Sequence, residues 1–265
     1  MDPGFLKKYR EDGYFVLPGL LEIDEVQAIC QEITRTIDQH PDVPEGLVQM
    51  EPRILSGEKQ VEDLEMGVRK LFRPARHVDF FRQLAFHPRL LEIAHAILGP
   101  DLLLMQSMTL MKPPHVSTEK IWHQDNAYFR VEPPDLFGFW IACDRTDVAN
   151  GCMHVLPGSH QGGIVEHAGS GDLYGATSPP DMQQAVAIPL DPGDGLVFHG
   201  ELLHYTPANR TSSRRRAVQY HYASGTVSRR CGANEFDYEP ELVVAGRNQL
   251  RRIEESKAEE GRTLL

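Results

Sequence analysis

A histidine and an aspartate that could share one metal ion stand two residues apart, in the tripeptide His123-Gln124-Asp125. The tripeptide closes a strand-like run, and residues i and i+2 of a strand project to the same face of a sheet. An imidazole and a carboxylate would therefore lie side by side, as a metal ion requires. Because short patterns of this kind recur by chance, a metal site needs a third ligand from another part of the chain.

Two histidines compete to be that third ligand. His199 ends the apolar run 195–198, and His204 begins the segment His-Tyr-Thr-Pro. Two histidines and one carboxylate on one face, with other coordination positions open, are typical of non-haem iron(II) oxygenases. Zinc held by the same ligands in a hydrolase stays open as an alternative, whereas the absence of cysteine ligands argues against a structural zinc site.

Arg215 favours the oxygenase over the hydrolase. It follows His204 by eleven residues and begins a strand-like segment. A guanidinium there can hold a carboxylate through two parallel hydrogen bonds, and a dicarboxylate that chelates the metal through its keto end needs such a partner at its far end. The alternative is a solvated charge run, since Arg214 and Arg216 flank this residue. Strand alternation, however, turns both neighbours toward the other face.

The composition is that of a soluble globular enzyme or ligand-binding domain. Of 265 residues, 41% are hydrophobic and 25% charged, and 27 Lys+Arg against 38 Asp+Glu leave a net charge of −11. This acidic balance argues against a nucleic-acid partner, because phosphate binding needs clustered cations. The chain has no apolar run of transmembrane length and no signal-peptide pattern at its start. We therefore expect a cytoplasmic protein with a small-molecule substrate and no membrane partner.

The spacing of apolar residues changes near residue 100. Before it, spacings of three and four predict a helix capped by Asp24 and a second helical region from Asp79 to Leu98, with residues 41–68 as a surface connection. After it, short runs bounded by Gly and Pro predict strands. The predicted strands are Leu102–Lys112, Ile121–Asp125, Gly138–Asp144, Met153–Leu156, Ala185–Ile188, Gly195–His199 and Arg215–Ala223. This order predicts a mainly β fold with flanking α-helices.

We expect a single domain over residues 1–265, with a helical N-terminal third, a β core at about 100–224 and a charged, solvated C-terminal tail. The segment Gly162–Gln184 is rich in Gly, Ser and Pro, which predicts a long loop between strands. Loops on a rigid scaffold commonly determine specificity. This loop and the 41–68 connection are therefore expected to shape the substrate site.

From Tyr9 to about Ser224 the sequence resembles the phytanoyl-CoA dioxygenase family of Fe(II)- and 2-oxoglutarate-dependent oxygenases. Four motifs in the family's order and spacing carry the resemblance. They are Leu110-Met111-Lys112-Pro113-Pro114, His123-Gln124-Asp125, Asn150-Gly151-Cys152 with Leu156-Pro157-Gly158-Ser159-His160, and His204-Tyr205-Thr206 with Arg215. The resemblance implies a double-stranded β-helix, the jelly-roll or cupin-like core, with helices supporting one sheet.

The resemblance also implies roles for individual residues, and it selects His204 over His199. The implied iron ligands are His123, Asp125 and His204. The far carboxylate of 2-oxoglutarate is assigned to Arg215 and Thr206. Further contacts with 2-oxoglutarate are implied for Lys70, Met108, Gln124 and Trp140.

Such a protein uses Fe(II), 2-oxoglutarate and O2 to hydroxylate a C–H bond of a small organic molecule or acyl substrate, with release of succinate and CO2. Asp125 favours hydroxylation, because related halogenases leave its coordination position open for a halide. A net charge of −11 gives a polyphosphate ligand such as an acyl-CoA a poor long-range field. The alternatives are a zinc-dependent hydrolase on the same three ligands and a non-catalytic small-molecule-binding module. The sequence does not indicate an oligomeric state.

Overall fold

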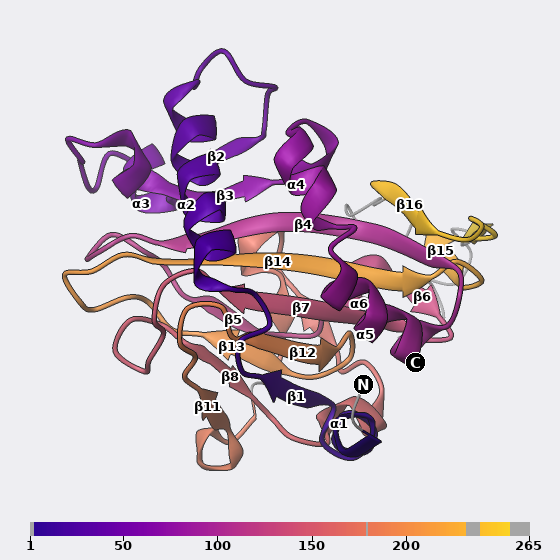
Figure 1. Ribbon diagram of the computed structural model, residues 1–265. Helices are drawn as coiled ribbons and strands as arrows, with labels where there is room; N and C mark the ends of the chain where they lie inside the picture. The colour runs from indigo at the N-terminus through magenta and orange to yellow at the C-terminus, as the bar shows by residue number, and fades with distance from the viewer. Residues whose placement is uncertain (1–2, 179, 232–238, 255–265) are drawn as a thin grey trace.

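Antiparallel sheets dominate the computed structural model, which describes residues 3–178, 180–231 and 239–254 (Figure 1). The largest sheet has eight strands. In spatial order it contains β1 (Tyr14–Leu17), β12 (Gly195–His199), β7 (Leu136–Ala142), β14 (Arg215–Ser224), β4 (Leu102–Lys112), β3 (Val68–Phe72) and β2 (Val48–Met50), and β16 (Leu242–Ala245) also pairs with β4.

A second, four-stranded sheet faces the first. Its strands in order are β11 (Val186–Ile188), β8 (Met153–Val155), β13 (His204–Thr206) and β5 (Lys120–His123). Side chains from both sheets line one cavity between them. This arrangement confirms the predicted mainly β fold of the jelly-roll class.

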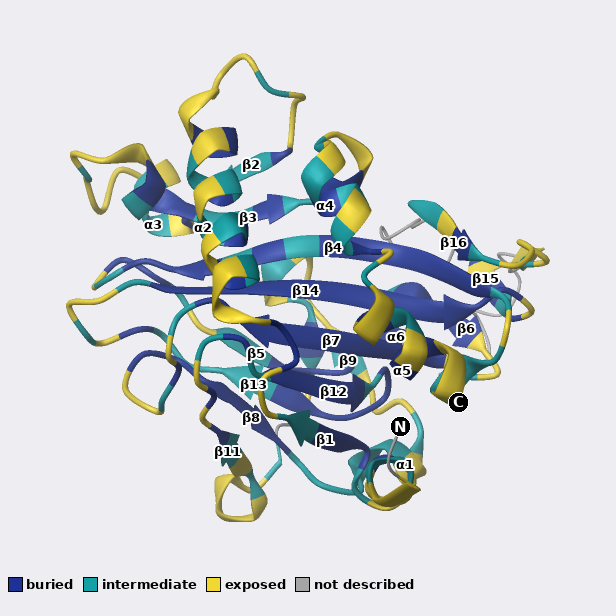
Figure 2. Cartoon of the chain, viewed as in Figure 1, coloured by how far each residue is buried: buried dark blue, intermediate teal, exposed yellow. Residues whose placement is uncertain are grey.

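Helices cover the outer face of the large sheet, two of them in front of β14 and β7 and α4 (Asp79–Leu84) beside β3 and β4 in Figure 1. The three are α2 (Ile23–Asp38), α4 and α5 (Pro88–Leu98). Their apolar sides pack on the sheet, and Figure 2 shows buried strands beneath helices whose outer surfaces are exposed. Two buried tyrosines of β14 also bind the helix layer, because Tyr220 Oη donates to Phe81 O (2.7 Å) and Tyr222 Oη to Ala85 O (2.8 Å).

Strand β14 shows how the fold separates core from site. Val218, Tyr220 and Tyr222 belong to the apolar core under the helices. The intervening residues therefore point to the inner face, where Arg215 and Gln219 line the cavity. Period-two alternation thus lets one continuous strand serve both the core and the site.

The predicted strands agree well with the structure. β4 and β12 have the predicted bounds, and the other five lie within two residues of them. Helix α2 starts two positions earlier than a cap at Asp24 would place it. Its N-cap is Glu22, whose backbone N–H donates to the Glu25 carboxylate (2.8 Å). Strand β13 was not predicted as a strand, since three residues are too few to show a period.

Residues 41–68 are not merely a surface connection, and that prediction is wrong. They contain β2 and α3 (Pro52–Leu55), and they end where β3 begins. β2 pairs with β3, and β3 pairs with β4, so the segment extends the large sheet. Short edge strands depend on such long-range pairing, which local composition does not reveal. The structure also adds a first helix, α1 (Pro3–Asp12).

The described part of the C-terminal tail is solvent-exposed, as predicted, but it is not an irregular extension. Arg251–Glu254 forms β17, which pairs in parallel with β15 (Ser228–Cys231). β15 in turn pairs with β6 (Val131–Glu132), next to the short helix α6 (Asn126–Phe129). The rest of the predicted tail, 255–265, lies outside the described residues. No helix in the described ranges combines the length and apolar character needed to cross a membrane.

The loop predicted at 162–184 folds back onto the second sheet. It contains a small hairpin of β9 (His167–Ala168) and β10 (Gly175–Ala176), with a 3-10 turn, Gly171–Leu173, between them. Gly175 permits this contact, because a Cβ atom there would lie 2.6 Å from the carbonyl oxygen of Trp122. The turn is thereby held at the cavity.

Candidate active site

Three buried side chains from the second sheet and its edge form a compact metal-binding group. His204 on β13 lies directly opposite His123 on β5, and Asp125 follows β5 at the start of α6. Asp125 Oδ1 lies 3.6 Å from His123 Nε2 and 3.7 Å from His204 Nε2. One ligand atom from each residue falls within 4.8 Å of the other two. The predicted triad is therefore brought together.

The protonation states of this group suit a divalent metal. Nδ1 of His123 lies 2.8 Å from Ile121 O and Nδ1 of His204 lies 2.9 Å from Leu202 O. A carbonyl only accepts, so each Nδ1 carries the proton and each Nε2 keeps its lone pair. Burial lowers the pKa of both imidazoles, which keeps them neutral.

Asp125 stays ionised in spite of its burial. Burial alone would raise the pKa of its carboxyl, but the neighbouring imidazoles, His221 first among them, bring that pKa below its ordinary value. Two neutral imidazoles and one carboxylate are the donor set of a two-His-one-carboxylate iron centre. The residues present therefore fit the metal that the fold implies.

His221 positions the aspartate ligand. Its Nε2 lies 2.7 Å from Asp125 Oδ2, and since a carboxylate only accepts, the imidazole donates. His221 is 1% exposed and projects from the inner face of β14. Sequence reasoning missed this residue. The available signal was its position six residues after Arg215, which places both side chains on one face of the strand.

We expect His221→Phe to weaken Fe(II) binding by roughly 10- to 100-fold, because loss of an outer-shell partner frees the ligand carboxylate to reorient. Phenylalanine keeps the ring volume against Phe129 and Phe198, which surround the histidine. Calorimetric titration with Fe(II) under anaerobic conditions measures the change. His154→Phe is the matched control, since His154 is a buried sheet histidine that contacts none of the ligands. Equal iron affinity in both variants would contradict the positioning role.

Arg215 lies in the same cavity as the metal ligands and is 2% exposed. Its guanidinium carbon lies 5.2 Å from the centre of the Trp140 ring, and Nη1 donates to Leu110 O at 3.4 Å. Arg215 Nε and Trp140 Nε1 are buried donors without a hydrogen-bond partner among the described residues. Unsatisfied buried donors are rare, so both indicate an acceptor that binds there.

Lys112 lies directly opposite Arg215 on the neighbouring strand β4. Its ammonium donates to Thr118 O (2.7 Å) and to Thr206 O (3.4 Å). Burial, together with the nearby Arg215, lowers the pKa of Lys112 well below its ordinary value. Two like charges directly across a sheet destabilise it unless an anion lies between them. Sequence reasoning missed Lys112 as a site residue, although it stands in one of the four family motifs.

Gly151 makes room for this lysine. It has φ +93°, and a Cβ atom there would lie 2.7 Å from Cδ of Lys112 and 2.6 Å from Pro207 O. The Asn150-Gly151 pair therefore does more than form the tight turn that its sequence predicts. It also keeps the buried lysine stem in place beside the site.

The other implied cosubstrate residues divide into two groups. Met108, Thr206 and Lys70 line the cavity with Trp140, although Lys70 is already paired with an acid. Gln124 does not line it. Its amide donates to Gly163 O and Glu201 O and accepts from Val165 N–H, so all its polar groups are occupied away from the cavity. Alternation explains this correction, because a residue between two same-face ligands points to the opposite face.

His199 lies apart from the metal group. Its Nδ1 accepts from Glu201 N–H (3.0 Å), and its ring packs near Tyr9 and His160. The flanking arginines also lie away from the cavity, as strand alternation predicts. Arg214 pairs with Glu65 (2.5 Å) and Arg216 binds both oxygens of Asp144 (2.9 Å each).

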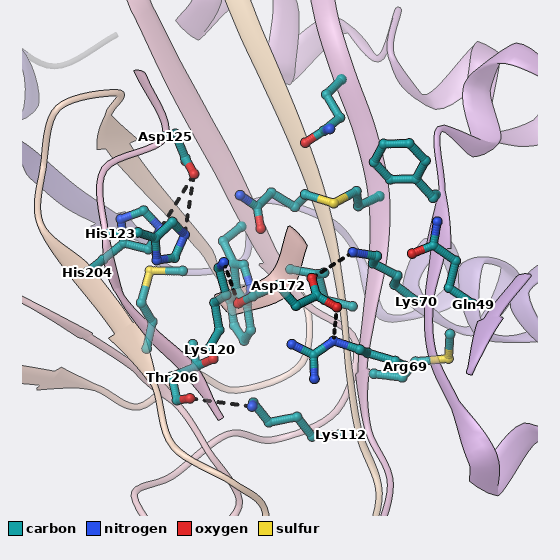
Figure 3. Close-up of a pocket in the computed structure, with 18 of the residues that line it drawn as sticks. Gln49, Arg69, Lys70, Lys112, Lys120, His123, Asp125, Asp172, His204 and Thr206 are labelled. Atoms are coloured by element: carbon teal, nitrogen blue, oxygen red, sulfur yellow. Dashed lines mark hydrogen bonds and ion pairs between the residues drawn. The ribbon is translucent and has the colours of Figure 1, made fainter. Parts of the chain in front are cut away.

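The cavity between the sheets has a volume of about 310 Å³ and is basic as well as apolar. Beyond Arg215 and Lys112, three further cations line it, namely Arg69, Lys70 and Lys120. Apart from the ligand Asp125, Asp172 is the one carboxylate among its described lining residues. Figure 3 shows the metal ligands on one side of the cavity and Asp172, between Arg69 and Lys70, on the other.

The fold and this site define an iron- and 2-oxoglutarate-dependent oxygenase. The family model described as Phytanoyl-CoA dioxygenase (PhyH) matches residues 9–217. The chain therefore belongs to the phytanoyl-CoA dioxygenase family and is a 2-oxoglutarate-dependent dioxygenase.

Individual relatives agree with this assignment. The peroxisomal phytanoyl-CoA dioxygenase of Rattus norvegicus is 28% identical over 229 residues, which cover 82% of this chain and 67% of the relative. EctD from S. alaskensis with bound Fe superposes with a TM-score of 0.74 at 18% identity, over 96% of this chain and 88% of EctD. The epimerase SnoN in complex with Fe3+, alpha ketoglutarate and nogalamycin RO gives a TM-score of 0.66 at 23% identity, over 94% and 99% of the two chains. These structures share the fold.

Proposed function

We propose that this dioxygenase hydroxylates an unactivated C–H bond of a small organic molecule or acyl substrate, with release of succinate and CO2. One observation carries the proposal: a neutral-histidine, ionised-aspartate triad shares its cavity with a buried guanidinium that has no carboxylate partner in the described residues. The triad suits the metal, and the guanidinium suits the far end of a dicarboxylate.

Each residue then has a defined task. His123, Asp125 and His204 would hold Fe(II), and when bound, iron and 2-oxoglutarate supply the oxidising chemistry that activates O2. Arg215 would bind the C5 carboxylate of 2-oxoglutarate, which also satisfies its buried Nε. Thr206 lines the same part of the cavity and can donate its hydroxyl to that carboxylate.

Lys112 would complete this carboxylate site. Its ammonium lies against Thr206 and opposite Arg215, so one carboxylate can neutralise both cations. Trp140 would supply its unsatisfied indole N–H to the same ligand and stack under the guanidinium. The two sheets bury the group, which excludes water and strengthens each of these contacts.

Two features support hydroxylation of a small molecule in particular. Asp125 occupies the coordination position that a halogenase would leave to a halide. The cavity is also lined by apolar side chains suited to a hydrocarbon portion of the substrate, among them Phe72, Leu110 and Met153. The relatives named for phytanoyl-CoA favour an acyl group as one form of that substrate.

Anaerobic addition of Fe(II) and 2-oxoglutarate tests the proposal. We expect a visible metal-to-ligand charge-transfer absorption that needs both components, followed on exposure to O2 by formation of succinate. A zinc-dependent hydrolase predicts no such absorption and no succinate, and a binding module predicts the absorption without turnover. Activity with Zn(II) alone on an ester or amide substrate, together with no absorption, would replace our proposal by the hydrolase.

A further inference from the structure

Three cations that line the cavity gather around Asp172. Arg69 and Lys70 project from β3 and Lys120 from β5. We call these three residues the basic cluster. Arg69 and Lys70 have side chains 11% and 15% exposed, so the cluster is largely sheltered from water. None of the three belongs to the Arg215–Lys112 pair.

The carboxylate of Asp172 fills the basic cluster in this structure. Arg69 Nε lies 3.0 Å from Oδ2 of this residue and Lys70 Nζ 2.9 Å from Oδ1. Asp172 comes from the 3-10 turn of the 162–184 loop and is itself more exposed, at 35% of its side chain. Since the turn meets the cavity through charge-assisted contacts, a competing anion can take the place of its carboxylate.

The contacts of Lys120 indicate that the basic cluster can accept more negative charge than the Asp172 carboxylate supplies. Its ammonium meets neutral acceptors, the hydroxyl of Tyr128 (2.6 Å) and the carbonyl oxygens of Asp172 (2.9 Å) and Tyr174 (3.2 Å). Burial lowers the pKa of Lys120 to about 8. A partly buried ammonium that has no carboxylate within ion-pair distance among the described residues is costly, and an anion placed between it and Lys70 would remove that cost.

The surroundings of the cluster favour a substrate anion over a cosubstrate anion. The far carboxylate of 2-oxoglutarate has its own partners in Arg215 and Lys112, on the neighbouring strands. Arg69 is also balanced in part by the buried Glu51 (3.3 Å) and Lys70 is paired with Asp172, which leaves Lys120 as the cation of the cluster still to be matched. Although the chain carries a net charge of −11, the cavity itself is basic. Local charge, rather than net charge, governs a bound ligand.

We propose that the basic cluster of Arg69, Lys70 and Lys120 binds an anionic group of the primary substrate, a carboxylate or a phosphate, in the place that the Asp172 carboxylate occupies. The substrate is then an amphiphile with its anionic group at the cluster and its apolar body toward the iron. This inference rests on the proposed function, since it concerns the substrate of the same cavity.

A set of matched probes tests the inference: hexanoate, hexyl phosphate and the neutral 1-hexanol. Each is titrated calorimetrically into anaerobic protein saturated with Fe(II) and 2-oxoglutarate, so that Arg215 is already occupied. We expect Asp172→Asn to bind the two anions about 10-fold more tightly than the unaltered protein, with 1-hexanol unchanged. Lys120→Met in the Asp172→Asn background should cancel this gain. A gain for hexanoate alone indicates a carboxylate substrate, and a gain for hexyl phosphate alone indicates a phosphate.

The control for the loop is Asp181→Asn, because Asp181 is an exposed carboxylate of the same segment that lies outside the cavity. It should leave all three affinities unchanged. Arg69→Gln in the Asp172→Asn background is the second cluster variant, should Lys120→Met unfold. If Asp172→Asn raises the affinity for 1-hexanol as much as that for the anions, Asp172 only obstructs entry to the cavity. If it leaves the affinity for the anions unchanged, the Asp172 carboxylate does not compete with them for the basic cluster. Either result overturns the inference.

The same samples separate this inference from the proposed function. The charge-transfer absorption of Fe(II) with 2-oxoglutarate is recorded before any probe is added. If the absorption is missing from the unaltered protein, the proposed function fails. If it is present and Asp172→Asn leaves the affinity for the anions unchanged, the substrate inference alone fails.

Discussion

Arg215→Ala is expected to weaken 2-oxoglutarate binding by roughly 10- to 150-fold while leaving Fe(II) binding nearly unchanged. In our proposal the buried guanidinium binds the far carboxylate, and a charge-assisted pair of this kind contributes about 1.5–3 kcal/mol. At ~1.4 kcal/mol per decade, its loss gives the stated range. Titration of 2-oxoglutarate into the Fe(II) protein, followed by its charge-transfer absorption, measures the effect.

Two further variants sharpen this experiment. Arg215→Lys should recover only part of the affinity, because an ammonium cannot reproduce two parallel hydrogen bonds or stack on Trp140 in the same way. Arg214→Ala is the neighbouring control, since Arg214 pairs with Glu65 on the opposite face. Arg216→Ala serves the same purpose with its thermal unfolding recorded alongside, because it breaks the two-point contact with Asp144. A larger loss in either neighbour than in Arg215→Ala would refute the assignment.

His204→Ala is expected to abolish Fe(II) binding, a loss of more than about 100-fold, whereas His199→Ala should leave it within about twofold. Removing an inner ligand must exceed the 10- to 100-fold typical of outer-shell residues. His204 contributes the Nε2 that faces Asp125 Oδ1 at 3.7 Å, and His199 contributes none. Anaerobic titration with Fe(II) measures both variants.

The free energy of unfolding must be measured alongside the iron affinity for both His204→Ala and His199→Ala. His199 packs near Tyr9 of α1, so His199→Ala is expected to lower the free energy of unfolding without touching the metal group. His204 is itself buried against Phe198, so His204→Ala is also expected to lower the free energy of unfolding, and iron affinity is compared at a temperature where both variants are folded. If His204→Ala still binds iron, and His199→Ala is folded but does not, then His199 is the ligand and our assignment is wrong.

Local sequence patterns predict this fold best where an element is long or clearly bounded. β4 and β12 were predicted with their observed bounds because each contains an apolar run and Gly or Pro residues lie at its ends. β2 could not be predicted, since three residues in a Pro- and acid-rich segment become a strand only by pairing with β3. The same dependence on distant partners explains why the described part of the C-terminal tail forms β17.

The residues of the candidate site were likewise predictable where the pattern is local and not where it depends on distant partners. His123 and Asp125 follow from a local i, i+2 pattern, but the choice of His204 over His199 needed the family resemblance. His221 and Lys112 act across strands, so their roles depend on partners that are distant in the sequence. The net charge of −11 describes the chain as a whole and does not reveal the cations that line the cavity between the sheets.

The Arg215–Lys112 pair has a consequence for the supply of the enzyme in the cell. Arg215 and Lys112 are buried opposite each other on β14 and β4, and burial beside the guanidinium lowers the pKa of Lys112, so the fully charged pair is costly until an anion arrives. A ligand that binds only the folded chain stabilises it by RT ln(1 + [L]/Kd), about 2.7 kcal/mol at a hundredfold excess over Kd. A change of that size alters the fraction of unfolded chain exposed to proteases. Shortage of 2-oxoglutarate would therefore lower the amount of this protein as well as its turnover.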